Sequence, residues 1–420
     1  MWSCRGSSLD RRPLAIPDYR RLWIASLIGA VGGSFSVITV PAQLYALTGS
    51  SATVGAAGGA SFVALVVGAL SAGALADVVD RRAVLLAAHC GLAGTYAALW
   101  LQTVLDARSV AVLLLLVACE GLTFGAIMAV TGATVPRVVP TELLLAANSL
   151  SSLVRYTGAI VGPLLGGVLI PLTGFGTLYL LDALALGAAI RAIVRLPPIR
   201  PTAAAAGRLG AALVALRPAF RYLLASRLLT AVLAIDLAAM VFGMPVALFP
   251  ELAHRGFGGP AGGGLELGCL YAAYPAGVFA AGLLSGTFTR VRRHGALLAS
   301  AAAVWGITVM VLGLAPRLWL ALAALVLGGA ANCLLSAFRN AITQAHTDDA
   351  LRGRIQGTLT VVLIGGPQLG NLIHGWIGAG YGVRPTIWTG GLLTAVTVVA
   401  IAQRTPQLWR YIPPGPRGVG

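Results

Sequence analysis

The chain has 420 residues, of which 58% are hydrophobic and 10% charged, whereas soluble domains carry roughly 25% charged residues. This composition excludes an ordinary soluble domain and predicts a chain that lies in a membrane. The formal net charge of +16 would suit nucleic-acid binding. The arginines that produce it lie mostly in short loops beside apolar runs, where they set topology, so no nucleic-acid partner is expected.

Twelve apolar runs are long enough to cross a bilayer, which takes roughly 20 residues. After a short N-terminal segment at 1–21, the first six predicted spans lie at 22–46, 51–76, 83–105, 110–134, 143–170 and 175–196. A polar connector with Pro and Arg follows at 197–219, and the second six spans lie at 220–250, 267–289, 295–315, 317–338, 355–380 and 384–402. The pattern predicts an all-α polytopic membrane protein of two six-helix bundles, over 22–196 and 220–403, with a tail at 404–420.

The arginines are unevenly divided between the two sides of the predicted membrane. With the N-terminus inside, the outer loops hold only Arg108, Arg255, Arg317 and Arg384. Because cytoplasmic loops carry an excess of basic residues, both termini and the 197–219 connector are expected to be cytoplasmic. The first apolar run has no signal-peptide cleavage pattern, so it is expected to remain as a span of a multi-pass protein in the cell (inner or plasma) membrane.

The loop between the second and third spans concentrates charge in an otherwise apolar chain. It reads Gly73-Ala-Leu-Ala-Asp77-Val-Val-Asp80-Arg81-Arg82. Gly73 would let a neighbouring helix approach closely, Asp77 would face the positive end of another helix, and the arginines would bind carboxylates or phosphates. The pattern G-x-L-A-D-x-x-x-R-R resembles the cytoplasmic loop signature of the major facilitator superfamily, which implies a twelve-helix transporter fold and a conformational-switch loop. The alternative is a loop that only sets topology.

The second half of the chain echoes the first. The motif Gly162-Pro163-x-x-Gly166 in the fifth predicted span returns as Gly366-Pro367-x-x-Gly370 in the eleventh. A degenerate copy of the loop signature, without its Asp, follows the eighth span at 282–293. These echoes predict two pseudo-symmetric halves that are related by an axis along the membrane normal.

The fifth predicted span carries Gly158, Gly162, Pro163, Gly166 and Gly167. Small residues at this spacing flatten one helix face, and the proline removes a backbone hydrogen bond and allows a bend. The pattern G-x-x-x-G-P-x-x-G-G resembles the antiporter signature of the same superfamily, although the expected upstream glycine is a serine here, at position 149. The alternative is a generic close-packing face.

Further motifs resemble the drug- and siderophore-exporter branch of the superfamily, over residues 17–405. They are Pro136-Arg137, Ala147-Asn148-Ser149-Leu150, the stretch from Asp236 to Pro245, Leu248-Phe249-Pro250, and Asp348-Asp349-x-x-Arg352-Gly353-Arg354. The resemblance implies a secondary active transporter that exports a small amphipathic molecule (a drug, a siderophore or a secondary metabolite) by alternating access, with protons as the coupling ion. The alternatives are uptake or facilitated diffusion by the same fold, and a membrane sensor that does not transport.

Four ionisable residues inside predicted spans stand out: Glu120, Arg155, Asp182 and Asp236. Such groups are costly in a bilayer and often functional, and a partly buried carboxyl can exchange a proton near ambient pH. Asp236 precedes a Gly-Met-Pro break at 243–245, so it is expected to line a cavity and is the first proton-coupling candidate, ahead of Asp182 and Glu120. Arg155 is a candidate anion-binding group or a partner of one of these acids. For each residue the alternative is a structural polar tie between helices.

Gln368, Asn371 and His374 share one face of the eleventh predicted span. They would form either a polar wall of the substrate path or a helix–helix contact. Five tryptophans near the ends or on the faces of predicted spans are expected mainly to anchor the chain at the membrane interface: Trp23, Trp305, Trp319, Trp376 and Trp388.

The chain contains no lysine, so a Walker A motif is absent and ATP hydrolysis by a P-loop is excluded. No H-E-x-x-H or G-x-S-x-G motif occurs, and the cysteines show no metal-ligand or redox spacing. We therefore expect no enzyme activity, no cofactor and no metal. We expect a transporter that functions as a monomer in the lipid bilayer, with a small-molecule substrate and protons as its partners.

Overall fold

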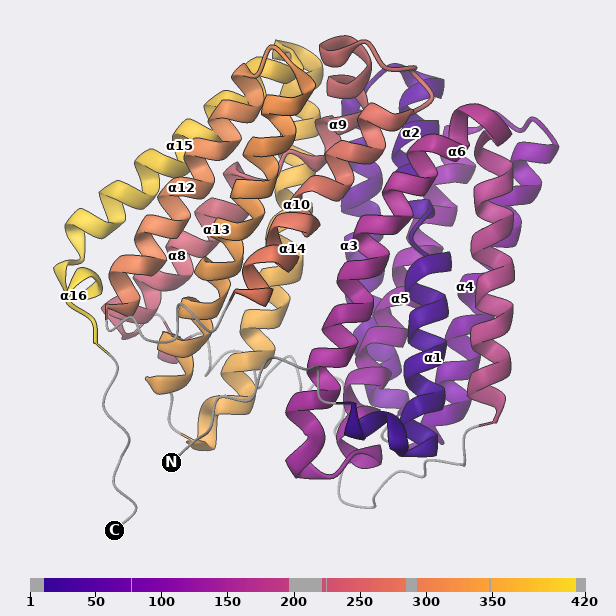
Figure 1. Ribbon diagram of the computed structural model, residues 1–420, viewed down its shortest axis with the longest axis horizontal. Helices are drawn as coiled ribbons and strands as arrows, with labels where there is room; N and C mark the ends of the chain where they lie inside the picture. Colours follow the sequence, from indigo (N-terminus) through magenta and orange to yellow (C-terminus); the bar gives the residue numbers. More distant parts are fainter. Residues whose placement is uncertain are drawn as a thin grey trace.

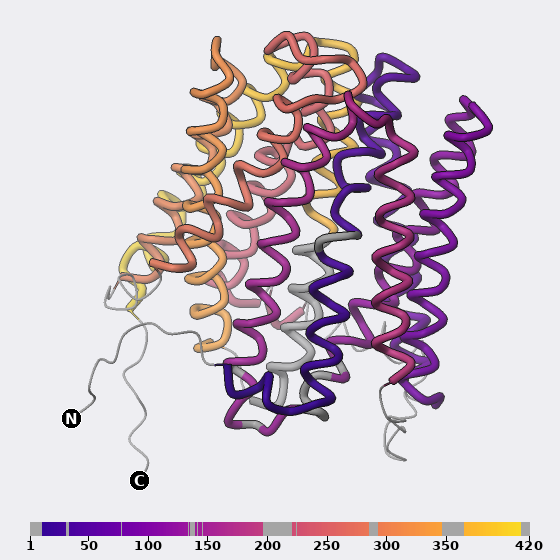
Figure 2. The backbone as a smooth tube through the Cα atoms, turned by 45° about the vertical axis from the view of Figure 1, so that its right-hand side comes forward, coloured from indigo at the N-terminus to yellow at the C-terminus, as the bar shows by residue number. Residues whose placement is uncertain are grey.

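The computed structural model describes residues 11–76, 78–195, 221–223, 225–284, 293–346 and 349–412. Within these ranges the chain is built of helices and contains no strand. Figure 1 shows two bundles side by side, one of indigo-to-magenta helices from the first half of the chain and one of orange-to-yellow helices from the second. Figure 2 shows the same division from another side. We call the end of the bundles at which the first span begins the near end, and the opposite end the far end.

The first bundle contains six spans. Its helices are α1 (Pro17–Gly32), α2 (Ser36–Thr48), α3 (Ser51–Leu75), α4 (Arg81–Val104), α5 (Val110–Val138) and α6 (Leu144–Val194), with short 3-10 helices η1 (Arg12–Ala15) and η2 (Thr141–Leu143). The first span is broken between α1 and α2, and α6 joins two spans across a kink at Gly174. The φ of +77° at Gly174 lies in the left-handed region that glycine adopts without strain.

In the described ranges, the second bundle begins with a broken span and continues with five long helices and one short one. The broken span consists of α8 (Arg227–Phe242), η3 (Val246–Leu248), α9 (Phe249–Glu251) and η4 (Leu252–Gly256). The helices that follow are α10 (Leu265–Leu283), α12 (His294–Leu314), α13 (Leu318–Ala345), α14 (Asp349–Tyr381), α15 (Val383–Arg404) and the short α16 (Pro406–Trp409).

The predicted all-α class with twelve spans is confirmed. In the described ranges, 8 helices have the length and apolar composition needed to cross a bilayer, and α6 accounts for two spans. The remaining spans are the broken α1–α2 pair, α10 and α14. The predicted connector at 197–219 lies outside the described residues. Large apolar side chains on the outside, such as Val63, Leu115 and Leu184, are more than half exposed, as expected of surfaces that face lipid.

The two bundles pack closely near the far end. Helix α6 meets α10, where a Cβ added to Gly167 would lie 2.6 Å from the Gly264 carbonyl oxygen. Helix α3 meets α14, where a Cβ added to Gly55 would lie 2.7 Å from the carbonyl oxygen of Asn371. Because a side chain would not fit at these positions, the glycines let the backbones of the two bundles approach each other.

Candidate functional site

A cavity of about 600 Å³ lies between the two bundles. Residues of α1, α2, α5 and α6 line it from the first bundle, and residues of η3, α9, α10, α12 and α13 line it from the second. Its wall is mostly apolar, and its aromatic residues are Phe124, Phe249, Tyr271, Tyr274 and Trp305. A concave apolar wall with few polar groups is the usual form of a small-molecule site.

Both bundles break their first span where it meets this cavity. The first break covers residues 33–35, between α1 and α2, and the second covers 243–245, between α8 and η3. Gly33, Ser34, Met244 and Pro245 all line the cavity. Irregular backbone at membrane depth is tolerated where it lines a cavity or is buried in protein. The sequence indicates the second break through its Gly-Met-Pro motif, and the structure adds the equivalent break in the first bundle.

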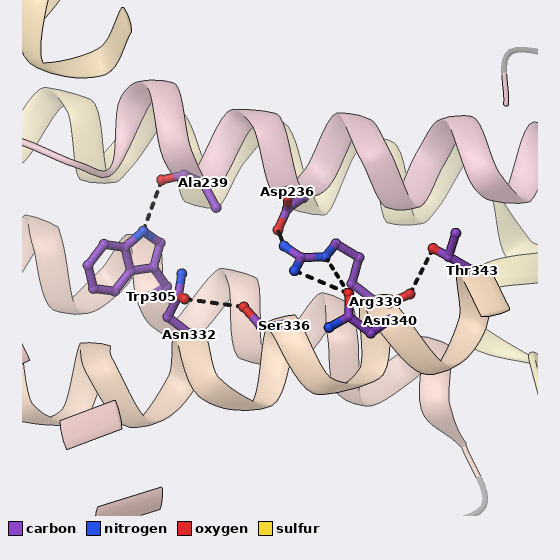
Figure 3. Close-up of polar contacts among 8 residues, drawn as sticks. All are labelled: Asp236, Ala239, Trp305, Asn332, Ser336, Arg339, Asn340 and Thr343. Atoms are coloured by element: carbon purple, nitrogen blue, oxygen red, sulfur yellow. Dashed lines mark hydrogen bonds and ion pairs between the residues drawn. The ribbon is translucent and has the colours of Figure 1, made fainter. Parts of the chain in front are cut away.

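Trp305 packs behind the second break and is not the interface anchor that the sequence suggested. It lies in the middle of α12 and is 2% exposed. Its Nε1 donates a hydrogen bond of 3.0 Å to the carbonyl oxygen of Ala239 (Figure 3), and its ring lies edge-on to Tyr274. A Cβ added to Gly243 would overlap the indole, so the tryptophan fits only because the break begins with glycine.

Arg155 of α6 lies on the wall of the cavity and is exposed to it. Its guanidinium lies 5.2 Å from the centre of the Tyr156 ring, and its Nη2 donates a long hydrogen bond of 3.5 Å to Ser152. Among the described residues no carboxylate pairs with it. Arg155 is therefore a cation in a mostly apolar cavity, and the predicted acids Glu120, Asp182 and Asp236 are held by other groups.

Asp236 of α8 forms a buried ion pair with Arg339 of α13. Arg339 Nη1 donates to Asp236 Oδ1 over 2.8 Å, and the two side chains are 5% and 0% exposed (Figure 3). Asp236 is thus not on the wall of the described cavities, contrary to the expectation from the sequence. Its Oδ2 has no hydrogen-bond partner among the described residues.

Arg339 is a residue that sequence reasoning placed wrongly. The predicted tenth span ended at 338, which put Arg339 in a loop, but α13 continues to Ala345 and carries the guanidinium inside the bundle. Arg339 Nε and Nη2 also lie 3.3 Å from Asn340 Oδ1. The guanidinium compensates the charge of Asp236, which alone would be costly at this depth.

A second polar cluster joins four helices of the first bundle beside the first break. The Ser36 N–H of α2 donates to Asp182 Oδ2 over 2.8 Å, and Ser36 Oγ donates to Glu120 Oε1 over 3.1 Å. The hydroxyl of Tyr96 on α4 donates to the same Glu120 oxygen over 3.0 Å. Two of the predicted acids, on α5 and α6, are therefore brought together by a serine and a tyrosine that the sequence did not single out.

Glu120 also lines a smaller cavity of about 330 Å³, together with Gln368 and Asn371 of α14. This cavity adjoins the larger one, because Val37 and Phe124 are among the residues that line both. Three predicted polar candidates from the two bundles thus surround one space. Asn371 Oδ1 also accepts a hydrogen bond of 3.1 Å from the backbone N–H of residue 247, in the second broken span.

His374, on the same face of α14, is part of a helix–helix contact. It is buried, with Nδ1 2.8 Å from the carbonyl oxygen of Gly370 and Nε2 3.1 Å from that of Phe242, the last residue of α8. The imidazole therefore lies against a carbonyl that the helix break leaves without a helical partner. This face of α14 therefore combines the two predicted alternatives. Gln368 and Asn371 line a cavity, and His374 forms a contact between helices.

The glycines of the fifth-span motif pack against two neighbours, the first span of the same bundle and α10 of the other bundle. A Cβ added to Gly158 would overlap Ala30 of α1, and one added to Gly162 would overlap Ser34 in the first break. A Cβ added to Gly166 would lie 2.7 Å from the Ile38 side chain. Gly167 faces α10 of the other bundle, as described above. Pro163 lines the large cavity. Close packing accounts for these glycines, and the antiporter assignment stays a prediction.

The loop between α3 and α4 ties helix ends together at the near end. Asp80 caps α4 by accepting a hydrogen bond of 3.0 Å from the Arg82 N–H. Arg82 Nη2 also donates to the Val194 carbonyl at the end of α6, and the buried Arg81 donates from Nε to the Ala76 carbonyl over 3.4 Å. A Cβ added to Gly73 would meet no atom within 4 Å, so the close helix approach expected there is not seen. Asp77 lies outside the described residues.

These groups can hold protons and an anion. The part of the chain that the structure describes contains no group of three or more His, Cys, Asp or Glu side chains that could hold a metal ion. The site offers two carboxyl sites, one inside each bundle, and a guanidinium on the cavity wall between them that has no carboxylate partner among the described residues.

Comparison with known proteins identifies the family. A family model described as a transmembrane secretion effector matches residues 9–409. The chain belongs to this family of major facilitator transporters. It is 30% identical over 373 residues to the enterobactin exporter EntS of Shigella flexneri, which covers 86% of this chain and 85% of that protein. It is also 30% identical over 371 residues to the enterobactin exporter EntS of Citrobacter koseri, with 86% of each chain covered.

Solved structures of major facilitator transporters share the fold. The nucleoside transporter NupG superposes with a TM-score of 0.71 at 14% identity, covering 94% of this chain and 99% of NupG. The human organic anion transporter MFSD10 gives a TM-score of 0.63 at 17% identity, covering 92% and 99%. The chain is accordingly a multi-pass membrane transporter of small molecules and not an enzyme.

Proposed function

We propose that this major facilitator is a secondary active transporter of the inner membrane that exports a small amphipathic molecule, driven by protons. The molecule would be a siderophore, a drug or another secondary metabolite. The observation that carries the proposal is the cavity between two bundles whose first spans are both broken. The relatives named as enterobactin exporters support export in particular.

The chemistry of the cavity supports a substrate with both ring and acidic or hydroxyl groups. Tyr271, Tyr274 and Phe124 offer broad apolar faces, which favour aromatic and alicyclic molecules. Arg155 offers a guanidinium without a described carboxylate partner, and such a group binds anionic oxygens or stacks on a ring. A purely apolar molecule would remove water from this guanidinium without forming a hydrogen bond or ion pair with it, so we favour an amphipathic substrate.

Packing at the far end supports alternating access. Ser51 Oγ of α3 donates a hydrogen bond of 2.5 Å to Glu251 Oε2 of α9 across the two bundles. Tyr45 of α2 and His254 of η4 form an edge-to-face ring contact at 6.2 Å. With both termini cytoplasmic, these contacts would close the outer side while the cavity receives substrate from the cytoplasm. Export would require them to open.

Two carboxyl sites are available for proton coupling, and we propose Asp236 as the first. Protonation of Asp236 would remove the charge that holds Arg339, so proton binding would change the contact between α8 and α13. Glu120 is the second candidate because it lies on a cavity wall, and Asp182 is connected to it through Ser36. The monomer would suffice for this cycle, since both bundles belong to one chain.

The test is accumulation of a panel of dyes and siderophores in cells with and without the protein, each with and without an uncoupler. Proton-driven export predicts lower accumulation with the protein, and the uncoupler should abolish the difference. An Arg155→Gln variant should lose export of anionic compounds more than of cationic ones. Higher accumulation with the protein would indicate uptake, and a change that the uncoupler leaves intact would indicate facilitated diffusion. No change for the whole panel would favour a sensor.

A further inference from the structure

A separate cavity of about 610 Å³ lies at the near end of the second bundle, away from the path between the bundles. It lies between the start of α8 and the end of α15, and residues of α16 complete its wall. None of the described residues that line it lines either cavity of the proposed transport path. It is therefore a separate space from the proposed transport path.

Two arginines line this cavity. Arg227 is the first residue of α8 and Arg404 is the last residue of α15, and both are exposed. The described residues that line the cavity include no acid, and within the described ranges neither arginine has an ion-pair partner. Arginine binds phosphate oxygens in a bidentate manner, so two unpaired arginines at one cavity favour a phosphate group.

Apart from Thr230, the described lining residues deeper in the membrane are apolar. Ala231 and Ala234 lie about one and two helical turns further into α8 than Arg227, and Ile401 lies about one turn before the end of α15. A phospholipid presents its groups in this order, with phosphate at the membrane boundary and acyl chains inward. A free phosphate ion would make no use of the apolar part.

Helix α16 fixes the outer wall at the membrane boundary. Gln407 of α16 lines the cavity, and the next residue, Leu408, is fully buried. A Cβ added to Gly295 of α12 would overlap the Leu408 carbonyl oxygen, so α16 lies directly on the bundle. Trp409 is 44% exposed, as is usual for tryptophan at the interface between membrane and water.

We propose that the cavity between α8, α15 and α16 binds the phosphate group of an anionic phospholipid. The two arginines would hold the phosphate oxygens, and the apolar part would receive the first segment of an acyl chain. Basic pockets between transmembrane helices are suited to such head groups.

The test is native mass spectrometry of the full-length detergent-purified protein, titrated with phosphatidylglycerol and, separately, with phosphatidylcholine. The cavity variant is Arg227→Gln/Arg404→Gln. The matched control is Arg191→Gln/Arg410→Gln, which removes two exposed arginines at the same end outside the cavity lining. We expect the cavity variant to bind phosphatidylglycerol about tenfold more weakly, with the control and all phosphatidylcholine affinities unchanged. Equal weakening in both double variants, or none in the cavity variant, would overturn the proposal.

Two further arms separate a lipid from a free ion and a binding defect from a folding defect. Millimolar inorganic phosphate should neither displace phosphatidylglycerol nor raise the melting temperature, and displacement would assign the site to a free phosphate instead. The Arg227→Lys/Arg404→Lys variant keeps both charges and should retain most of the lipid affinity. All three double variants should melt at the wild-type temperature without lipid, because the substituted side chains are exposed.

Discussion

Asp236 and Arg339 depend on each other, because each would otherwise be a buried charge without a partner. The two side chains are almost fully buried, and breaking a buried pair by removing one partner typically costs about 3–5 kcal/mol. Protonation of Asp236 resembles such a removal, since it leaves the guanidinium without its counter-charge. A proton that binds here is therefore expected to have structural consequences that a proton on an exposed acid would not have.

We expect Asp236→Asn to abolish uphill, proton-driven efflux while substrate binding and downhill exchange remain. The amide permanently mimics the protonated acid, so the site can no longer cycle. Transport into inverted vesicles with an imposed pH gradient measures the first property, and counterflow without a gradient measures the second. The control is Asp106→Asn, whose ion pair with Arg108 is largely exposed. Uphill pumping at the wild-type rate by Asp236→Asn would refute the assignment and make Asp182 the next residue to test.

Arg339→Ala is expected to destabilise the protein. It leaves a buried carboxylate without its counter-charge, with an expected loss of about 3–5 kcal/mol. Thermal melting in detergent measures the loss. The double variant Asp236→Asn/Arg339→Ala should recover part of the stability, because the unpaired charge is gone. A double variant as unstable as Arg339→Ala alone would show that the guanidinium acts through packing and not through the pair.

At the scale of helices, α6 and α10 can approach closely because glycines lie at their contact. We expect Gly167→Ala to hold the bundles apart at the far end, because its Cβ would lie 2.6 Å from the Gly264 carbonyl oxygen. A cysteine introduced at Ser51 should then react faster with a membrane-impermeant thiol reagent added from the far side, and efflux should fall. Gly187→Ala in the same helix is the control, since its Cβ would meet no atom within 4 Å. Equal labelling of both variants would contradict the role of this contact.

The loop between α3 and α4 connects the ends of three helices, so it is placed to bias the near end between two states. We expect Asp77→Asn and Arg81→Ala each to impair transport while membrane insertion stays normal, because these changes shift a conformational equilibrium and leave the spans intact. Transport and surface-normalised expression are measured together. Arg20→Ala, an exposed arginine at the same end, serves as the control. Full transport by both loop variants would mean that the loop only sets topology.

For the whole molecule, the arginine distribution predicts the orientation of the chain. A single cysteine placed at Gly207, in an otherwise cysteine-free background, should stay unlabelled by an impermeant reagent in intact cells and react after permeabilisation. The connector carries basic residues that favour the cytoplasmic side. A cysteine at Arg317, in the predicted outer loop, should show the reverse pattern. Strong labelling at 207 in intact cells would overturn the proposed orientation.

The sequence predicts the overall fold well because composition and hydropathy act along the chain. The twelve spans, the two halves and the break before Pro245 follow from local patterns. The site depends on contacts between helices, which local patterns do not contain. Arg339 was placed in a loop because a charge at the end of an apolar run looks like a helix end. The junction of Asp182 and Glu120 through Ser36 needs three helices to converge at a break that no proline marks.

Because α16 packs on α12, the position of a C-terminal tag or fluorescent fusion matters for this protein. Leu408 is fully buried and Tyr411 nearly so, and the Leu408 carbonyl occupies the place where a side chain at position 295 would lie. A purification tag or fluorescent fusion that replaces residues from 406 onward would remove a packed part of the bundle. The same fusion placed after Ile412, which is 57% exposed, would leave that packing untouched.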